Sequence, residues 1–209
     1  RIRRPPTPPR RPSRQHAKNG PGLRQLRAWA SLWAFGTPIL ASIEDGKTAM
    51  TNVKSALARF WSAADLLEDY ERPTSNAPAT PEHLALFEAA IGDPLPPDAR
   101  DFFQAHDSIS AMDVHNGYSI GGSAILTRSV SRGDFPTKID SWSVFPIGSD
   151  GGGNAFLATV AEGGPVWKWR HDVGLSVWLA GSLAEFFGRL ADDVRAFADG
   201  ETDWDFMAG

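Results

Sequence analysis

Apolar side chains recur at helical spacing in four stretches of the chain after residue 50. Each stretch is bounded by residues that favour helix ends, a capping Ser, Thr or Asn in front and a Gly or Pro behind. The pattern predicts helices over "TNVKSALARFWSAADLLEDYERP", "PEHLALFEAAIG", "DPLPPDARDFF" and "GSLAEFFGRLADDVRAFADG". The residues expected to start or end them are Thr51 or Asn52, Pro73, Thr80 with Pro81, Gly92, and Ser182 with Glu185.

The middle of the chain contains short apolar runs separated by Gly, Asn, Asp and Pro, which are typical of strands. The expected strands are "YSIGG", "AILT", "WSVFPIG", "AFLATV", "PVWKWRHD" and "LSVWLA". The intervals "SDGGGN" and "AEGG" are too short for helical crossovers, so neighbouring strands should pair antiparallel as a meander. Helices before and after the strands predict an α+β fold in which helices cover one face of an antiparallel multi-stranded sheet.

The first 49 residues differ from the rest in charge. They hold ten Lys and Arg against Glu44 and Asp45, a balance of +8, whereas the 11 basic and 23 acidic residues from Met50 onward give −12. Five prolines among the first twelve residues and the lack of apolar periodicity predict disorder. We therefore expect a disordered, basic, Pro/Arg-rich extension over 1–49 that is dispensable for folding, and a single α+β domain over 50–209.

Three interpretations of this extension stay open. An apolar stretch over 28–43 follows basic residues, as in an export signal, but it is interrupted by Gly-Thr-Pro and too short to span a bilayer. A nucleic-acid-binding tail would be basic too, although Arg interleaved with Pro carries no recognition motif. The third interpretation is that the native chain starts at Met50, the first methionine, which lies directly before a helix start.

Three consecutive glycines lie in "IGSDGGGNAFLA", Ile147–Ala158, between two expected strands. A P-loop or a dinucleotide-binding loop would need GxxxxGK[ST] or GxGxxG followed by a helix. Asp150, Asn154 and Ser149 do not supply the alternating oxygen donors of a calcium loop. We expect an architectural turn with positive φ at several positions, so that Gly152→Val would be destabilising.

Recognisable catalytic motifs are sparse. The absence of cysteine excludes a thiol nucleophile and a cysteine zinc site, and neither HExxH nor GxSxG occurs. Asp150 with His171 and Asp172 is the one candidate cluster, for a metal-assisted hydrolase. Trp167 and Trp169 alternate with basic residues, which predicts two indoles on one sheet face, in the core rather than in a base-stacking platform, because an acidic domain repels nucleic acid.

Several of these segments together resemble the SUKH superfamily: "TPEHLALFEAAIG", "LPPDARDFFQAH", "FPIGSDGGGNAFLA", "GPVWKWRHD" and "GSLAEFFGRL". That superfamily includes the yeast Smi/Knr cell-wall regulators, the bacterial protein Syd and many bacterial immunity proteins of polymorphic toxin systems. The similarity covers residues 79–198. The chain departs from the pattern where the family usually has Asn-Gly-Gly after the LP helix, because "HDSIS" stands there and "HNG" follows later.

The resemblance implies a cytoplasmic α+β binding domain without catalytic activity, cofactor or metal. Its implied function is to neutralise a cognate bacterial toxin by direct contact, and a basic nuclease toxin would suit the acidic domain. An intracellular regulatory scaffold of the Smi/Knr kind is the alternative. Neither nucleic acid nor a membrane is expected as a partner.

The partner-binding residues are expected among acidic and aromatic positions near strand ends and loops, because aromatic anchors surrounded by charge are typical of tight interfaces. These positions are Asp113, Asp134, Asp140, Trp142, Asp150 and Asp172.

Overall fold

A computed structural model describes residues 52–201, so the predicted extension over 1–49 lies outside the described residues. The helices are α1 (Val53–Ala64), α2 (Pro81–Ile91), α3 (Pro97–Ala105), α4 (Ser123–Arg132) and α5 (Leu183–Ala198). The strands are β1 (Thr74–Ser75), β2 (Ser108–Ala111), β3 (Tyr118–Gly121), β4 (Lys138–Ile139), β5 (Trp142–Asp150), β6 (Ala155–Thr159), β7 (Val166–Arg170) and β8 (Leu175–Ala180). Within residues 52–201, no helix combines the length and the apolar character needed to cross a membrane.

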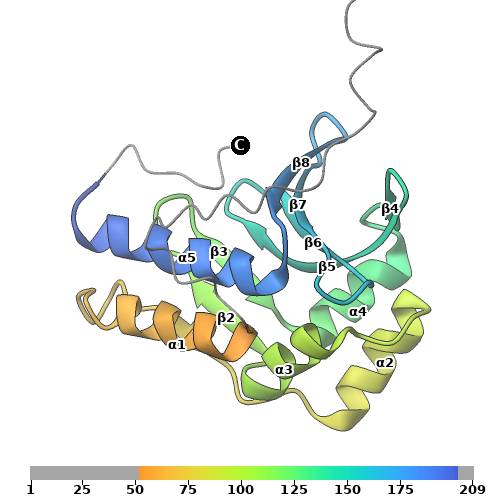
Figure 1. Cartoon of the computed structure of the whole chain (residues 1–209), viewed down its shortest axis with the longest axis horizontal. Coiled ribbons are helices and arrows are strands. Elements are labelled where there is room, and N and C mark those ends of the chain that lie inside the picture. The colour runs from red at the N-terminus through yellow and green to blue at the C-terminus, as the bar shows by residue number, and fades with distance from the viewer. Residues whose placement is uncertain (1–51, 202–209) are drawn as a thin grey trace, which may run out of the picture. The chain divides into compact units, whose positions relative to one another are not determined.

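The strands form one open antiparallel sheet (Figure 1). Its order is β1-β2-β3-β5-β6-β7-β8, and β4 pairs with β5 beside this path. Strands β5 to β8 follow one another along the chain and in the sheet, which confirms the predicted meander. The β5–β6 register shifts between Pro146 and Gly148, and the β7–β8 register shifts between Val166 and Trp167.

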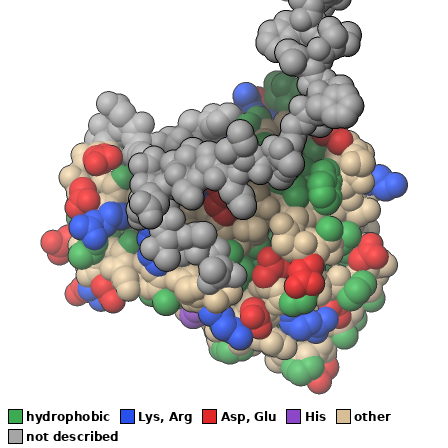
Figure 2. Space-filling model, in the orientation of Figure 1, with side chains coloured by type: hydrophobic (Ala, Val, Ile, Leu, Met, Phe, Trp, Pro, Cys, Tyr) green, Lys and Arg blue, Asp and Glu red, His purple; other side chains and the backbone are tan. Residues whose placement is uncertain are grey.

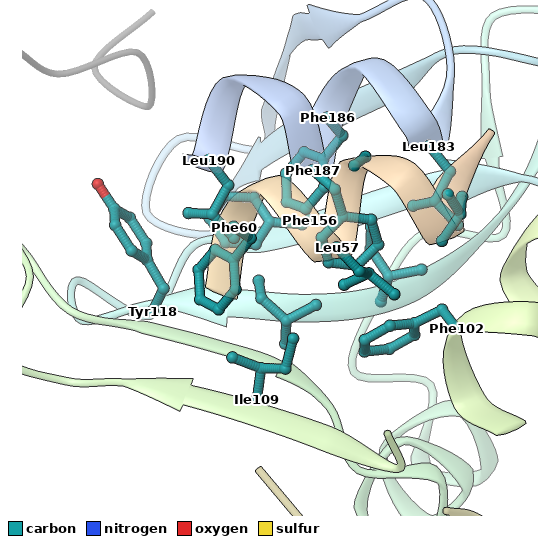
Figure 3. Packing of buried hydrophobic residues seen from close by; sticks show 14 of the residues in the cluster. Leu57, Phe60, Phe102, Ile109, Tyr118, Phe156, Leu183, Phe186, Phe187 and Leu190 are labelled. Carbon is teal, nitrogen blue, oxygen red and sulfur yellow. The ribbon is translucent and has the colours of Figure 1, made fainter. Parts of the chain in front are cut away.

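The main hydrophobic core lies between the sheet and the helices, and all five helices contribute buried side chains to it. Helices α1 and α5 run side by side across one sheet face (Figure 1), which confirms the predicted α+β fold. Their side chains meet those of the sheet in Figure 3, where the labelled residues include Leu57, Phe60, Ile109, Phe156, Phe186, Phe187 and Leu190. Burying each large side chain contributes about 1.5–3 kcal/mol, so this layer holds the first and last helices on the sheet.

The predicted helix ends agree with the structure, except at the end of α1. The side chains of Asn52, Thr80 and Ser182 each accept a hydrogen bond from a backbone N–H in the first turn of a helix. Helix α1, however, ends at Ala64 rather than near Pro73. Leu67 is still buried, because turn hydrogen bonds carry the chain back to the core, and its periodic position made the helix look longer than it is.

The prediction of a strand at "AILT" is wrong, because residues 124–127 lie inside α4. Gly122, with a φ of 86°, turns the chain after β3, and the Asp107 carboxylate accepts a hydrogen bond of 2.9 Å from the Ser123 N–H. The turn at Gly122 and the hydrogen bond to the Ser123 N–H together start helix α4. Its apolar residues then divide between the core side, where Leu126 is buried, and the solvent side, where Ile125 is exposed.

One contact between α1 and α3 should make stability depend on pH. The indole N–H of Trp61 donates a hydrogen bond of 3.1 Å to Nε2 of His106, which requires that nitrogen to be unprotonated. Burial lowers the pKa of His106 below its usual value. The folded state therefore binds the proton less readily than the unfolded state does.

We expect the free energy of unfolding to be insensitive to His106 above about pH 7 and to fall as the pH drops through its lowered pKa. His106→Gln keeps an acceptor for the indole and removes this titration, so the variant should lose less stability than the wild type between about pH 7 and pH 5. Denaturant unfolding at several pH values measures the difference. His171→Gln, at an exposed position, is the matched control and should follow the wild type.

Candidate protein-binding surface

The glycine segment is the turn between β5 and β6, as predicted. Both carboxylate oxygens of Asp150 accept hydrogen bonds from Asn154, one from its backbone N–H at 2.9 Å and one from its amide group at 2.8 Å. The Asp150 N–H donates to the Asn154 carbonyl at 3.0 Å, and the Gly153 N–H donates to the Asp150 carbonyl at 3.0 Å. One Asp and one Asn thus close the turn around the three glycines.

The reason for the glycines differs from the predicted one. Of the three, only Gly153 has positive φ, at 80°. Gly151 is required by crowding instead, because a Cβ there would lie 1.9 Å from the backbone carbonyl oxygen of Asn116 in the β2–β3 loop. Gly152 does not have positive φ, so the backbone strain expected at that position is absent, and a Cβ there would lie 3.3 Å or more from the nearest side-chain atoms.

Asp150 lies inside the protein and has almost no surface to offer a partner. It is 5% exposed, and its Oδ2 lies 3.4 Å from Nζ of Lys168, which is 8% exposed. Lys168 points to the helix-covered face of the sheet, because its β6 neighbour Phe156 belongs to the main core. Asp150 therefore offers a partner little surface, and its carboxylate stabilises the turn and pairs with a buried lysine.

The three residues of the hydrolase hypothesis do not gather into one cluster. His171 lies beside Gly153. Asp172 is exposed and lies 3.5 Å from Arg170, while Asp150 is held inside by Asn154 and Lys168. In the part of the chain that the structure describes, no group of three or more His, Asp or Glu side chains could hold a metal ion.

A second buried polar contact, not anticipated from the sequence, links α5 to β3. The Tyr118 hydroxyl donates a hydrogen bond of 2.5 Å to the carboxylate of Asp193, which is fully buried. A ring nitrogen of His115 lies 3.2 Å from the Asp193 carbonyl oxygen. Tyr118 is also the cross-strand partner of Asp150, so both polar pairs lie at the same end of the sheet.

A second, smaller hydrophobic cluster covers the other face of β5 to β7. Its buried members are Ile139, Val144, Ala155, Leu157 and Trp167, and Phe135 and Trp169 pack against it. The two indoles of β7 therefore lie on one face and Lys168 on the other, as alternation predicts. Trp167 is buried and Trp169 partly buried, which agrees with a core position.

Three of the predicted binding residues surround this cluster. Trp142, at the start of β5, is 40% exposed, and its ring centre lies 6.3 Å from that of Trp167. Asp140 lies in the tight β4–β5 turn with a φ of 51°. Asp134 precedes Phe135, and a hydrogen bond from Arg132 holds its pKa below the usual value. Figure 2 shows hydrophobic side chains at the surface between the parts of the molecule where Figure 1 places β4 and the β7–β8 strands.

Asp113, in the β2–β3 loop, belongs to a different surface, which we call the Tyr70 patch. Tyr70 follows α1 and is 78% exposed. The carboxylates of Glu71, Glu68 and Asp113 raise the pKa of its phenol, Glu71 most strongly, so charges from two separate segments of the chain act on this side chain. Figure 2 shows acidic side chains, with some basic ones, at the end of the molecule where Figure 1 places the C-terminal ends of α1 and α5.

Exposed apolar side chains flank the residues of the Tyr70 patch in the sequence. Leu66, four residues before Tyr70, and Met112, next to Asp113, are both exposed. An exposed aromatic ring with apolar neighbours and surrounding charge has the composition of a protein interface rather than of a catalytic pocket. The sequence contained part of this signal in "LLEDYE", but the contribution of Asp113 depends on how the β2–β3 loop folds.

The comparisons with known proteins agree with this architecture. No curated protein matches the chain. The model of the SMI1 / KNR4 family (SUKH-1) matches residues 78–189, a segment that runs from α2 through the glycine turn into α5. The family includes immunity proteins and Smi/Knr-type regulators, and the match covers more than half of the chain. The chain therefore belongs to the SMI1 / KNR4 family (SUKH-1).

Proposed function

We propose that this protein is a non-enzymatic immunity protein that neutralises a cognate bacterial toxin by direct contact in the cytoplasm. The observation that supports the proposal, beyond family membership, is the Tyr70 patch, where the carboxylates of Glu71, Glu68 and Asp113 act on the exposed Tyr70 side chain. Such a surface suits a basic protein partner better than nucleic acid, whose phosphates it repels.

The charge of the domain supports a basic toxin. From Met50 onward, 11 basic and 23 acidic residues give a balance of −12. A nuclease toxin needs a cationic surface to bind its substrate, and an acidic partner can cover that surface while being steered toward it by long-range attraction. Electrostatic steering raises the association rate, which matters for a protein that must reach the toxin before the toxin reaches nucleic acid.

Exposed aromatic and apolar side chains would supply the rest of the affinity. Tyr70, Leu66 and Met112 are exposed within the Tyr70 patch, and rigid aromatic side chains are enriched among residues that dominate binding energy. The positions around the second cluster, Asp134, Asp140 and Trp142, together with Asp172, form the competing candidate surface, so the experiment has to separate the two.

The test is coexpression of the full chain with the product of the adjacent upstream gene in a sensitive host, followed by measurement of survival and copurification. We expect survival and a stable complex. Glu68→Lys with Asp113→Lys should slow association about tenfold at low salt, with a smaller effect at high salt. Asp93→Lys with Glu162→Lys reverses the same number of exposed charges elsewhere and should leave the rate within about twofold of the wild type.

Trp142→Ala distinguishes the two surfaces. If it weakens the complex while the Glu68/Asp113 variant does not, the toxin binds around the second cluster and the Tyr70 patch is not the interface. Survival without this protein, or no complex with a toxic neighbour, would contradict the immunity function and favour the Smi/Knr-type regulatory scaffold.

A further inference from the structure

The two edges of the sheet are built differently. Strand β1 has two residues, and Pro73 and Pro78 lie close to its ends, so this edge offers little backbone for another strand to pair with. Strand β8 forms the opposite edge with six residues, "LSVWLA", that include neither proline nor a charged residue. Long, uncharged edges are normally covered, because their unpaired N–H and C=O groups attract further strands.

Among the strands of the described residues, β8 pairs with β7 alone. Within residues 52–201, no backbone hydrogen bond joins its outer edge to another segment. It also exposes large apolar side chains, since Leu175 is 60% and Trp178 is 51% exposed even though the Arg189 guanidinium lies 5.0 Å over the Trp178 ring. Exposed apolar side chains along an unpaired strand edge favour contact with another strand.

We propose that β8 pairs antiparallel with β8 of a second copy of this chain, so that the two sheets join across a two-fold axis. This inference does not depend on the proposed function. We choose a second copy of the chain as the partner because the β8 edge is self-complementary, which a two-fold interface requires.

The charges at the two ends of β8 support a second copy of this chain as the partner. Arg170 and Asp172 lie beside the start of the strand, and Glu185 and Arg189 lie beside its end. Antiparallel pairing brings the start of one strand next to the end of the other. Each end holds one cation and one anion, so both junctions can place opposite charges together, and the uncharged strand between them adds no repulsion.

Side-chain sizes are complementary as well. A register centred on Val177 places Trp178 of one copy opposite Ser176 of the other, because paired residues must point to the same sheet face. A large indole would then lie beside a small side chain on each side of the axis, and the exposed apolar area of both strands would become buried.

The first experiment is sedimentation equilibrium of the full chain over a concentration series. We expect a monomer–dimer equilibrium. Ser176→Lys places two like charges near the axis and should weaken dimerisation at least tenfold. Ser75→Lys makes the same change at the exposed β1 edge and should leave the equilibrium unchanged. A wild-type chain that stays monomeric, or a dimer that Ser176→Lys does not weaken, would overturn the proposal.

The second experiment uses the absence of cysteine from the chain. In the expected register, Val177→Cys brings two thiols within the distance at which a disulfide forms between paired strands. Mild oxidation should yield a covalent dimer that melts like the reduced protein, whereas Ser75→Cys should stay monomeric. Equal crosslinking of the two variants would show that the thiols meet by random collision, which contradicts β8 pairing.

Discussion

Asp150→Ala is expected to lower the free energy of unfolding by about 3–5 kcal/mol, a loss typical of removing one partner of a buried ion pair. Two effects add in the same direction. Lys168 stays in a site that is 8% exposed but loses the carboxylate 3.4 Å away. Asn154 loses both hydrogen bonds to the Asp150 side chain, so the β5–β6 turn is no longer closed. Denaturant unfolding at neutral pH measures the change.

The control is Asp172→Ala, which removes an exposed carboxylate 3.5 Å from Arg170 and should cost less than about 1 kcal/mol. Lys168→Met then separates the ion pair from the turn. If the pair dominates, the double variant Asp150→Ala/Lys168→Met should be more stable than Asp150→Ala alone, because it also removes the buried charge that had paired with Asp150. Strict additivity would assign the effect to the hydrogen bonds with Asn154.

Local signals explain why much of the fold could be predicted from the sequence. The caps at Asn52, Thr80 and Ser182 act within one helical turn, so their residue types alone indicate where helices begin. The meander was predictable because the intervals between β5 and β8 leave no room for a crossover. By contrast, the run "AILT" is too short for its pattern to distinguish a strand from a buried helix face. The chain forms a helix there because Gly122, with positive φ, turns the backbone after β3.

The candidate site was less predictable because it depends on contacts between distant segments. Alternation placed Lys168 opposite the indoles, but it could not show that its face is the one covered by α1 and α5, where Asp150 also lies. The acidic run next to Tyr70 was visible in the sequence, whereas its proximity to Asp113 arises when the β2–β3 loop packs. The apolar exposure of β8 likewise depends on its place at the edge, which the strand order determines.

The glycine turn yields the second large expected effect. Gly151→Ala should lower the free energy of unfolding by about 3 kcal/mol, because its Cβ would lie 1.9 Å from the Asn116 carbonyl oxygen. That oxygen belongs to the backbone, which cannot move out of the way as easily as the end of a side chain. The same displacement would break the hydrogen bond of 2.8 Å that the Gly151 N–H donates to the Gly117 carbonyl. Thermal or denaturant unfolding of the purified variant measures the loss.

The neighbouring glycines supply matched controls and a rank order. Gly153→Ala should cost about 1 kcal/mol, because alanine is strained at a φ of 80°. Gly152→Ala should change stability by less than about 1 kcal/mol, since its Cβ would meet side-chain atoms at 3.3 Å or more and alanine also restricts the unfolded chain. If Gly153→Ala proves the most damaging, its positive φ rather than contact with the β2–β3 loop limits this turn. The expected order, with Gly151 first, would instead show that close packing against the loop carrying Asn116 limits which residues this turn accepts.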